Sequence, residues 1–175
     1  MLDRRLIARL DAARVRFCLI GDHALVAHGC APRHGDVELL TVDDTVLRPL
    51  FWEGHPKPTV SLDDAAGPAV GRLRWDGTPP HELVMGRDHA MVFACNTARL
   101  HEDLGCRVAT PLGLVLVLLV LGGPRSRADI IELIRAQEAR FDRPWRPAVE
   151  EHRGLLSPTA RESWHQVELD LGTPT

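Results

Sequence analysis

The spacing of apolar and polar residues along the chain predicts a mixture of helices and strands. Residues 2–15 place apolar side chains on one helical face, whereas residues 17–20 form an unbroken apolar run that ends at a glycine, as buried strands do. The same criteria predict further helices at 22–29, 45–52, 88–97, 111–121, 125–141 and 157–169, and further strands at 36–40, 70–75, 81–85 and 106–109. This succession predicts an α/β (α+β) fold.

Residues 54–69 interrupt the pattern. They contain two glycines and three prolines and have no apolar periodicity, which predicts a surface loop. A loop of this length either covers an active-site cleft or is a plain flexible connection, and the sequence leaves both open.

Length and composition fit one globular domain. The chain has 175 residues, of which 45% are apolar and 26% charged. We expect residues 1–142 to form the domain and residues 143–175 to form a C-terminal helical extension of it. The net charge of −3 gives no global positive field, so it does not favour nucleic acid as a partner. Lys57 is the sole lysine, so any phosphate must be bound by arginine, backbone amides or a metal ion.

The cysteines and the apolar runs bear on the location of the protein. Cys18, Cys30, Cys95 and Cys106 show neither a CxxC motif nor metal-ligand spacing, which favours reduced structural thiols. The N-terminal residues lack the apolar core of a signal peptide, and the apolar run at 112–121 is too short to cross a bilayer. We therefore expect a cytoplasmic protein without membrane association.

The predicted strand at 36–40 carries the most informative chemistry. Asp36 and Glu38 are two residues apart, so on a strand their side chains point to the same face. Adjacent like charges on one face repel each other and disfavour folding. A solvated sheet edge tolerates such a pair, and so does a bound divalent cation. Mg²⁺ is commonly held by one or two carboxylates together with substrate phosphates.

The residues around this pair resemble the nucleotidyltransferase superfamily. The first strand ends in GD at Gly21, 13 residues follow, and DVEL then begins at Asp36. The HGD that ends at Asp36 is similar to the small antibiotic-modifying members, the aminoglycoside and lincosamide nucleotidyltransferases. The AxxAHG that begins at Ala24 is similar to stand-alone nucleotidyltransferase-like proteins of toxin–antitoxin systems.

The resemblance implies a fold and a set of ligand-binding residues. The fold would be a nucleotidyltransferase-like mixed β-sheet flanked by helices, with further helices at the C-terminus. Gly21 and Asp22 would hold a nucleoside triphosphate (NTP), and Asp36 and Glu38 would hold two Mg²⁺ ions.

The resemblance also implies a third acid on a neighbouring strand. That acid would complete the metal site or act as general base for the acceptor hydroxyl. Glu82 is the closest match, and Asp76 is the alternative if the strand register differs. Charge alone suggests Arg33 or Arg99 as the residue that neutralises phosphate.

A second segment, residues 108–134, is also similar to these enzymes. Asp129 matches an acid that follows their apolar helix, although its expected place at the start of a helix also explains it as a partner of the helix dipole. Many relatives carry a lysine in the apolar helix, where this chain has Leu118.

Two classes of function follow. The first is an Mg²⁺-dependent nucleotidyltransferase that transfers a nucleoside monophosphate from an NTP to a hydroxyl group of a small molecule, such as an antibiotic, or of a macromolecule. The second is a catalytically impaired relative that binds a nucleotide or a protein partner. Asp22 discriminates them, because a carboxylate beside a polyphosphate is repulsive unless a metal ion or an arginine intervenes.

Overall fold

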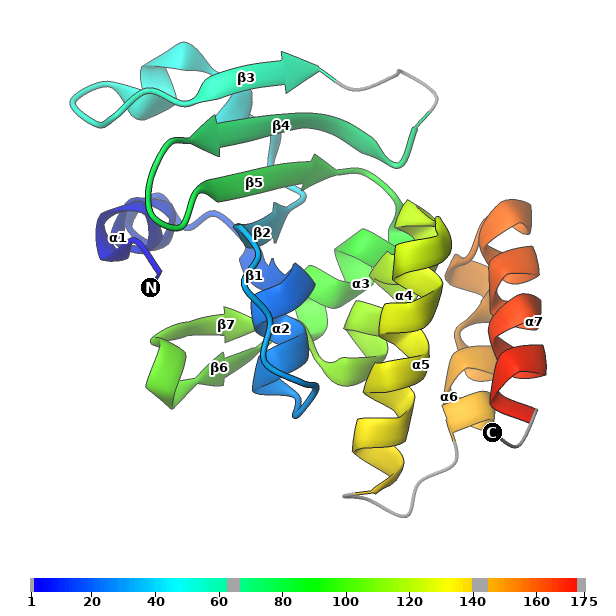
Figure 1. The fold of residues 1–175 in the computed structure, drawn as a ribbon. Coiled ribbons are helices and arrows are strands. Elements are labelled where there is room, and N and C mark those ends of the chain that lie inside the picture. Colours follow the sequence, from blue (N-terminus) through cyan, green and yellow to red (C-terminus); the bar gives the residue numbers. More distant parts are fainter. Residues whose placement is uncertain (1, 63–66, 140–144, 173–175) are drawn as a thin grey trace.

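The computed structural model describes residues 2–62, 67–139 and 145–172, and it confirms the mixed α/β architecture (Figure 1). One open sheet runs through the described chain in the strand order β3-β4-β5-β2-β1-β7-β6. Strands β2 and β5 pair in parallel, as do β1 and β7, and the other neighbours are antiparallel. The strands are β1 (Phe17–Ile20), β2 (Val37–Thr41), β3 (Thr59–Leu62), β4 (Ala69–Trp75), β5 (His81–Gly86), β6 (Arg99–His101) and β7 (Cys106–Val108).

Helices cover both faces of the sheet. On one face lies α1, where the backbone N–H of Asp3 donates to Nε2 of His81 at 2.9 Å. On the other face lies α3, where Sγ of Cys95 is 4.0 Å from Sγ of Cys18 on β1. The α-helices are α1 (Arg4–Ala12), α2 (Gly21–Ala27), α3 (His89–Thr97), α4 (Pro111–Leu121), α5 (Pro124–Glu138), α6 (Trp145–Glu151) and α7 (Pro158–Gly172).

The apolar helix α4 is the centre of the helical layer. The hydroxyl of Thr110 caps it by accepting from the N–H of Gly113, as the Thr-Pro sequence predicts. It is apolar on every side, and residues 113–119 are all buried, as expected for a core helix. Helices α6 and α7 pack against α4 through buried side chains such as Val149 and Trp164, so residues 145–172 share its hydrophobic core.

Several elements differ from the sequence-based expectation. The helix expected at 45–52 is two 3₁₀ helices, η1 (Asp44–Leu47) and η2 (Pro49–Trp52), because Pro49 cannot donate the hydrogen bond that would continue the first. The expected loop at 54–69 contains the edge strand β3, and β6 and α6 were not predicted. The expected helix end at 141 and the boundary between 142 and 143 lie outside the described residues.

The cysteines are free and buried. Burial raises the pKa of the Cys106 thiol to about 11, which keeps it protonated and unreactive near neutral pH. None of the helices in the described ranges combines the length and apolar character that crossing a membrane requires.

Candidate active site

The turn between β1 and α2 is built on Gly21. Its φ of +64° lies in the left-handed region, which glycine adopts without steric cost. A Cβ at this position would lie 2.8 Å from Cδ of Glu38, so a larger residue would collide with that carboxylate. The backbone at the start of α2 therefore lies directly against the side chain of Glu38.

The register of the central strands brings Glu38 and Glu82 together. Glu38 on β2 pairs with Glu82 on β5, which in turn pairs with Arg74 on β4. Residues paired across neighbouring strands point to the same face, so the two carboxylates stand side by side. Asp76 lies in the exposed turn after β4, away from this row. Glu82 is therefore the acid that the fold brings to Glu38.

Two arginines of β4 contact the acids on this face. Nη1 of Arg72 is 2.7 Å from Oε1 of Glu82, and Nη2 of Arg74 is 3.3 Å from Oδ2 of Asp36. Asp36 precedes the first residue of β2 and reaches Arg74 over the intervening strand β5. Asp36, Glu38 and Glu82 thus share one surface, which we call the carboxylate face.

Glu38 differs from its two neighbours because it has no basic partner in contact. Within the described residues, its carboxylate makes neither a hydrogen bond nor an ion pair. Burial raises its pKa above the usual value, and the nearby charges of Glu82 and Asp22 add to this, against the smaller opposing effects of Arg125 and Arg72. A group held at such electrostatic cost is typical of a functional site, and a bound cation would relieve the cost.

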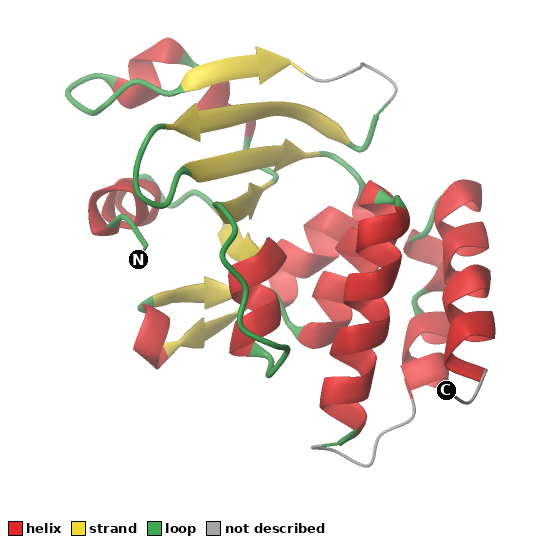
Figure 2. Cartoon of the chain, in the orientation of Figure 1, coloured by secondary structure: helices red, strands yellow, loops and turns green. Residues whose placement is uncertain are grey.

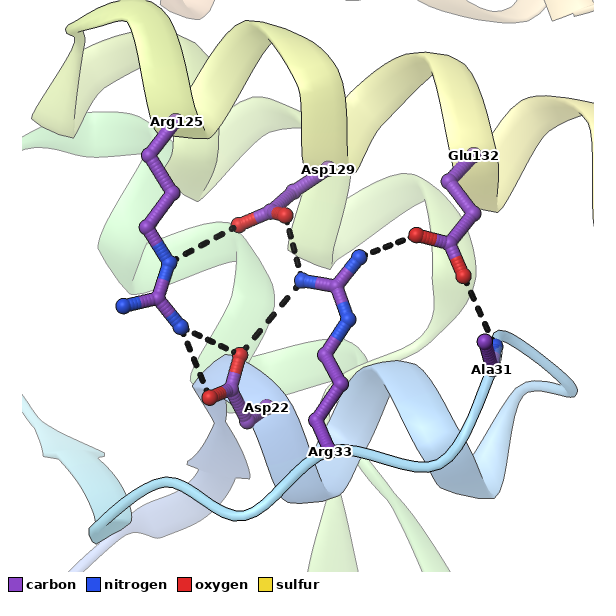
Figure 3. Close-up of polar contacts among 6 residues, drawn as sticks. All are labelled: Asp22, Ala31, Arg33, Arg125, Asp129 and Glu132. Carbon is purple, nitrogen blue, oxygen red and sulfur yellow. Dashed lines mark hydrogen bonds and ion pairs between the residues drawn. The ribbon is translucent and has the colours of Figure 1, made fainter.

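A second cluster of charges joins α2 to α5 (Figure 3). Arg33 forms ion pairs with Asp129 and Glu132 of α5 and lies 3.4 Å from Oδ1 of Asp22. Nη2 of Arg125 contacts both carboxylate oxygens of Asp22, at 2.8 and 2.7 Å. We call these five residues the Arg33 network.

The Arg33 network fixes the loop that leads to Asp36. This loop, residues 28–36, returns along the length of α2 (Figure 2). Glu132 accepts from the backbone N–H of Ala31 at 2.7 Å, and this hydrogen bond lowers the pKa of Glu132. Gly35 lies against Asp22 so closely that a Cβ there would be 3.0 Å from Cγ of Asp22. Helix α5 therefore positions the segment that carries the first acid of the carboxylate face.

The remaining candidates from the sequence take other places. Arg33, expected to neutralise phosphate, is engaged by three carboxylates. Arg99 lies on β6, separated from β2 by two strands, and Leu118 is buried in α4. Asp129 is in the second turn of α5 and is buried, so capping of the helix dipole, which acts in the first turn, does not explain it.

Three basic residues near the site were not recognised from the sequence. Arg72 and Arg74 are two residues apart on β4, just as Asp36 and Glu38 are two residues apart at the start of β2. This matching spacing of opposite charges was the signal in the sequence that could have indicated the ion pairs. Arg125 had no such signal, because its contact with Asp22 joins residues 103 positions apart.

The residues of the carboxylate face fit Mg²⁺ bound together with a phosphate ligand. No group of three or more His, Cys, Asp or Glu side chains in the described part of the chain is placed to hold a metal ion by itself. However, Mg²⁺ demands only one or two carboxylates when substrate phosphates complete its coordination. The adjacent carboxylates of Glu38 and Glu82 meet that requirement.

The chain was also compared with known proteins. No model of a protein family matches it, and no curated protein matches it.

Proposed function

We propose that the protein is an Mg²⁺-dependent nucleotidyltransferase that transfers a nucleoside monophosphate to a hydroxyl group of an acceptor. The observation that carries this proposal is the position of the Glu38 carboxylate, which lies against Gly21 and beside Glu82 with no basic partner in contact among the described residues. Negative charge of this kind, next to a glycine that lets a ligand approach the backbone, suits a metal-bound polyphosphate.

The residues of the carboxylate face divide the chemistry between them. Asp36 and Glu38 would hold the metal ions, and for this role Asp36 would give up its contact with the exposed Arg74. Glu82 completes the metal site or accepts the proton of the acceptor hydroxyl, whose oxygen attacks the α-phosphorus as the bond to pyrophosphate breaks. Bound Mg²⁺ would supply charge stabilisation for the phosphates and the leaving pyrophosphate.

Asp22 bears on whether a triphosphate can bind at all. The negative charge of its carboxylate is compensated, because Arg125 and Arg33 both lie within ion-pair distance of it. This arrangement supports the proposal, since arginines near a polyphosphate offset the repulsion from a carboxylate. The acceptor is a small molecule, such as an antibiotic, or a macromolecule. A cytoplasmic location is consistent with the free thiols and with the need for NTP.

A second function, nucleotide binding without turnover, is favoured by one specific observation. Asp22, Asp36 and Glu82 each have an arginine partner, so the acids contribute less net charge than the sequence suggests. In that case the site would bind a nucleotide through the arginines and would not carry out transfer.

The test is a binding and turnover screen. Calorimetry with ATP, GTP, CTP and UTP, each with and without Mg²⁺, should show metal-dependent binding of at least one nucleotide. Pyrophosphate release across candidate acceptors should identify turnover. Glu38→Gln should abolish the metal-dependent part of both signals, whereas Glu53→Gln, the same change at an exposed position, should leave both intact. Binding without pyrophosphate release from any acceptor would favour the second function.

A further inference from the structure

Arg125 is an exposed arginine paired with a buried carboxylate. Its side chain is 75% exposed, although it contacts both oxygens of Asp22, whose side chain is only 11% exposed. It also lies 3.9 Å from Asp129. An exposed guanidinium is free to leave its partner at little cost in desolvation, whereas the buried carboxylate of Asp22 stays where it is.

The charges of the Arg33 network do not balance. Asp22, Asp129 and Glu132 carry three negative charges, and Arg33 and Arg125 carry two positive charges. Arg33 lies 3.4 Å from Asp22 and is held there by Asp129 and Glu132, through contacts that do not involve Arg125. The network therefore keeps one compensating arginine for Asp22 when Arg125 moves.

Arg125 lies close to the carboxylate face through Asp22. Glu38 lies against Gly21, the residue before Asp22, and the carboxylate of Asp22 contacts Arg125. In keeping with this position, the charge of Arg125 lowers the pKa of Glu38, as does that of Arg72 on β4. Figure 3 shows Arg125 at one end of the network, with the carboxylate of Asp22 between it and Arg33. A phosphate group next to Glu38 would be within the electrostatic range of this guanidinium.

We propose that Asp22 is a built-in competitor for the phosphate site: its carboxylate occupies Arg125, and a phosphate group of the substrate binds by taking Arg125 over. This inference rests on the proposed function, because it assumes that the anion bound beside Glu38 is a polyphosphate. The same guanidinium N–H groups can donate to a carboxylate or to a phosphate, so the two anions can exchange at Nη2 of Arg125. Asp22 thus holds the affinity for the anion below the value that Arg125 alone would give.

The test measures the affinity of inorganic tripolyphosphate, and separately of ATP with Mg²⁺, by calorimetry on the whole chain. Asp22→Asn should bind tripolyphosphate on the order of tenfold more tightly, and Arg125→Gln on the order of tenfold more weakly, as expected for one charge-assisted contact. Arg127 is another arginine of α5 and is paired with Asp170 of α7. Arg127→Gln should therefore leave the affinity unchanged. The gain from Asp22→Asn should vanish in the double variant with Arg125→Gln.

Each outcome decides the proposal. If Asp22→Asn binds no more tightly, or if its gain survives in the double variant, Asp22 does not compete for Arg125. If Asp22→Asn does not fold, an unchanged affinity in Arg125→Gln overturns the proposal by itself. Tighter binding of tripolyphosphate without any metal-dependent binding of ATP would support the exchange and refute the nucleotidyltransferase. Turnover that depends on Glu38 but not on Asp22 or Arg125 would support the nucleotidyltransferase and refute the exchange.

Discussion

Two neighbouring groups of acids in this protein differ in how far arginines compensate their charge. In the Arg33 network, all three carboxylates, from α2 and α5, form ion pairs with Arg33 or Arg125. On the carboxylate face, Glu38 stands beside Glu82 without a basic partner in contact, and its pKa is raised. Apart from the exposed contact between Arg125 and Asp22, the first group has the character of a structural joint, and the second has the character of a binding site.

The difference shows how to separate structural acids from functional ones. Removing an arginine from a cluster of ion pairs leaves buried carboxylates unpaired, which is costly. Removing a carboxylate from a group of like charges relieves repulsion, which stabilises the fold. The sign of the change in stability therefore separates a cluster held by ion pairs from a group of acids that repel each other, independently of any assay of function.

The largest expected effect is at the centre of the Arg33 network. Arg33→Met should lower the free energy of unfolding by about 3 kcal/mol, because it leaves three carboxylates with only Arg125. For a chain of this length the melting temperature should fall by about 6–12 °C. Thermal unfolding measures this. Arg48→Gln is the control, since Arg48 forms an exposed pair with Asp44 at 3.9 Å and should change stability little. An equally small effect of Arg33→Met would show that the network does not hold α5 to the loop.

A smaller loss is expected at the contact between Gly21 and Glu38. Gly21→Ala loses stability for two reasons: alanine is strained at a positive φ, and its Cβ would collide with the carboxylate of Glu38. Gly105→Ala has the same strain, at φ +62°, but its Cβ would meet open space. We expect about 1 kcal/mol for Gly105→Ala and about twice that for Gly21→Ala, measured by urea unfolding. The excess at Gly21 should disappear when Glu38 is also changed to Ala. Equal losses at the two glycines would mean that Glu38 does not lie against Gly21.

The same comparison shows what the sequence could reveal. The core strands and α4 follow from uninterrupted apolar runs and the Thr-Pro cap, and these determine where Gly21 and the acids of β2 lie. The pairing of Glu38 with Glu82 across the strands could not be predicted from the sequence alone, because strand register depends on pairing between distant segments. The Arg33 network could not be predicted for a similar reason, since its contacts between the segment around α2 and helix α5 join residues about 100 positions apart.

The carboxylate face should respond to mutation in the opposite direction. Glu38→Gln should raise the free energy of unfolding by about 0.5–1 kcal/mol at pH 7, the size of a cross-strand repulsion between like charges. Because burial and neighbouring charge raise the pKa of Glu38 in the folded state, the native protein holds this proton more tightly than the unfolded chain. The wild type therefore loses stability relative to Glu38→Gln as the pH rises above the ordinary glutamate pKa of about 4.3. Below that pH the difference should vanish, and a loss of stability at pH 7 would assign Glu38 to structure.

The smallest expected change in stability belongs to Asp36. Its partner Arg74 is 54% exposed and lies 3.3 Å away, so the ion pair is screened by solvent. Asp36→Asn should shift the free energy of unfolding by less than about 0.5 kcal/mol while abolishing any Mg²⁺-dependent release of pyrophosphate. Parallel melting curves and turnover assays measure the two effects on the same preparation. Asp36 lies outside β2, and among the described residues Arg74 is its only ion-pair partner. A large loss of stability would therefore mean that its carboxylate supports the fold, and the metal site would then lose one of its two proposed ligands.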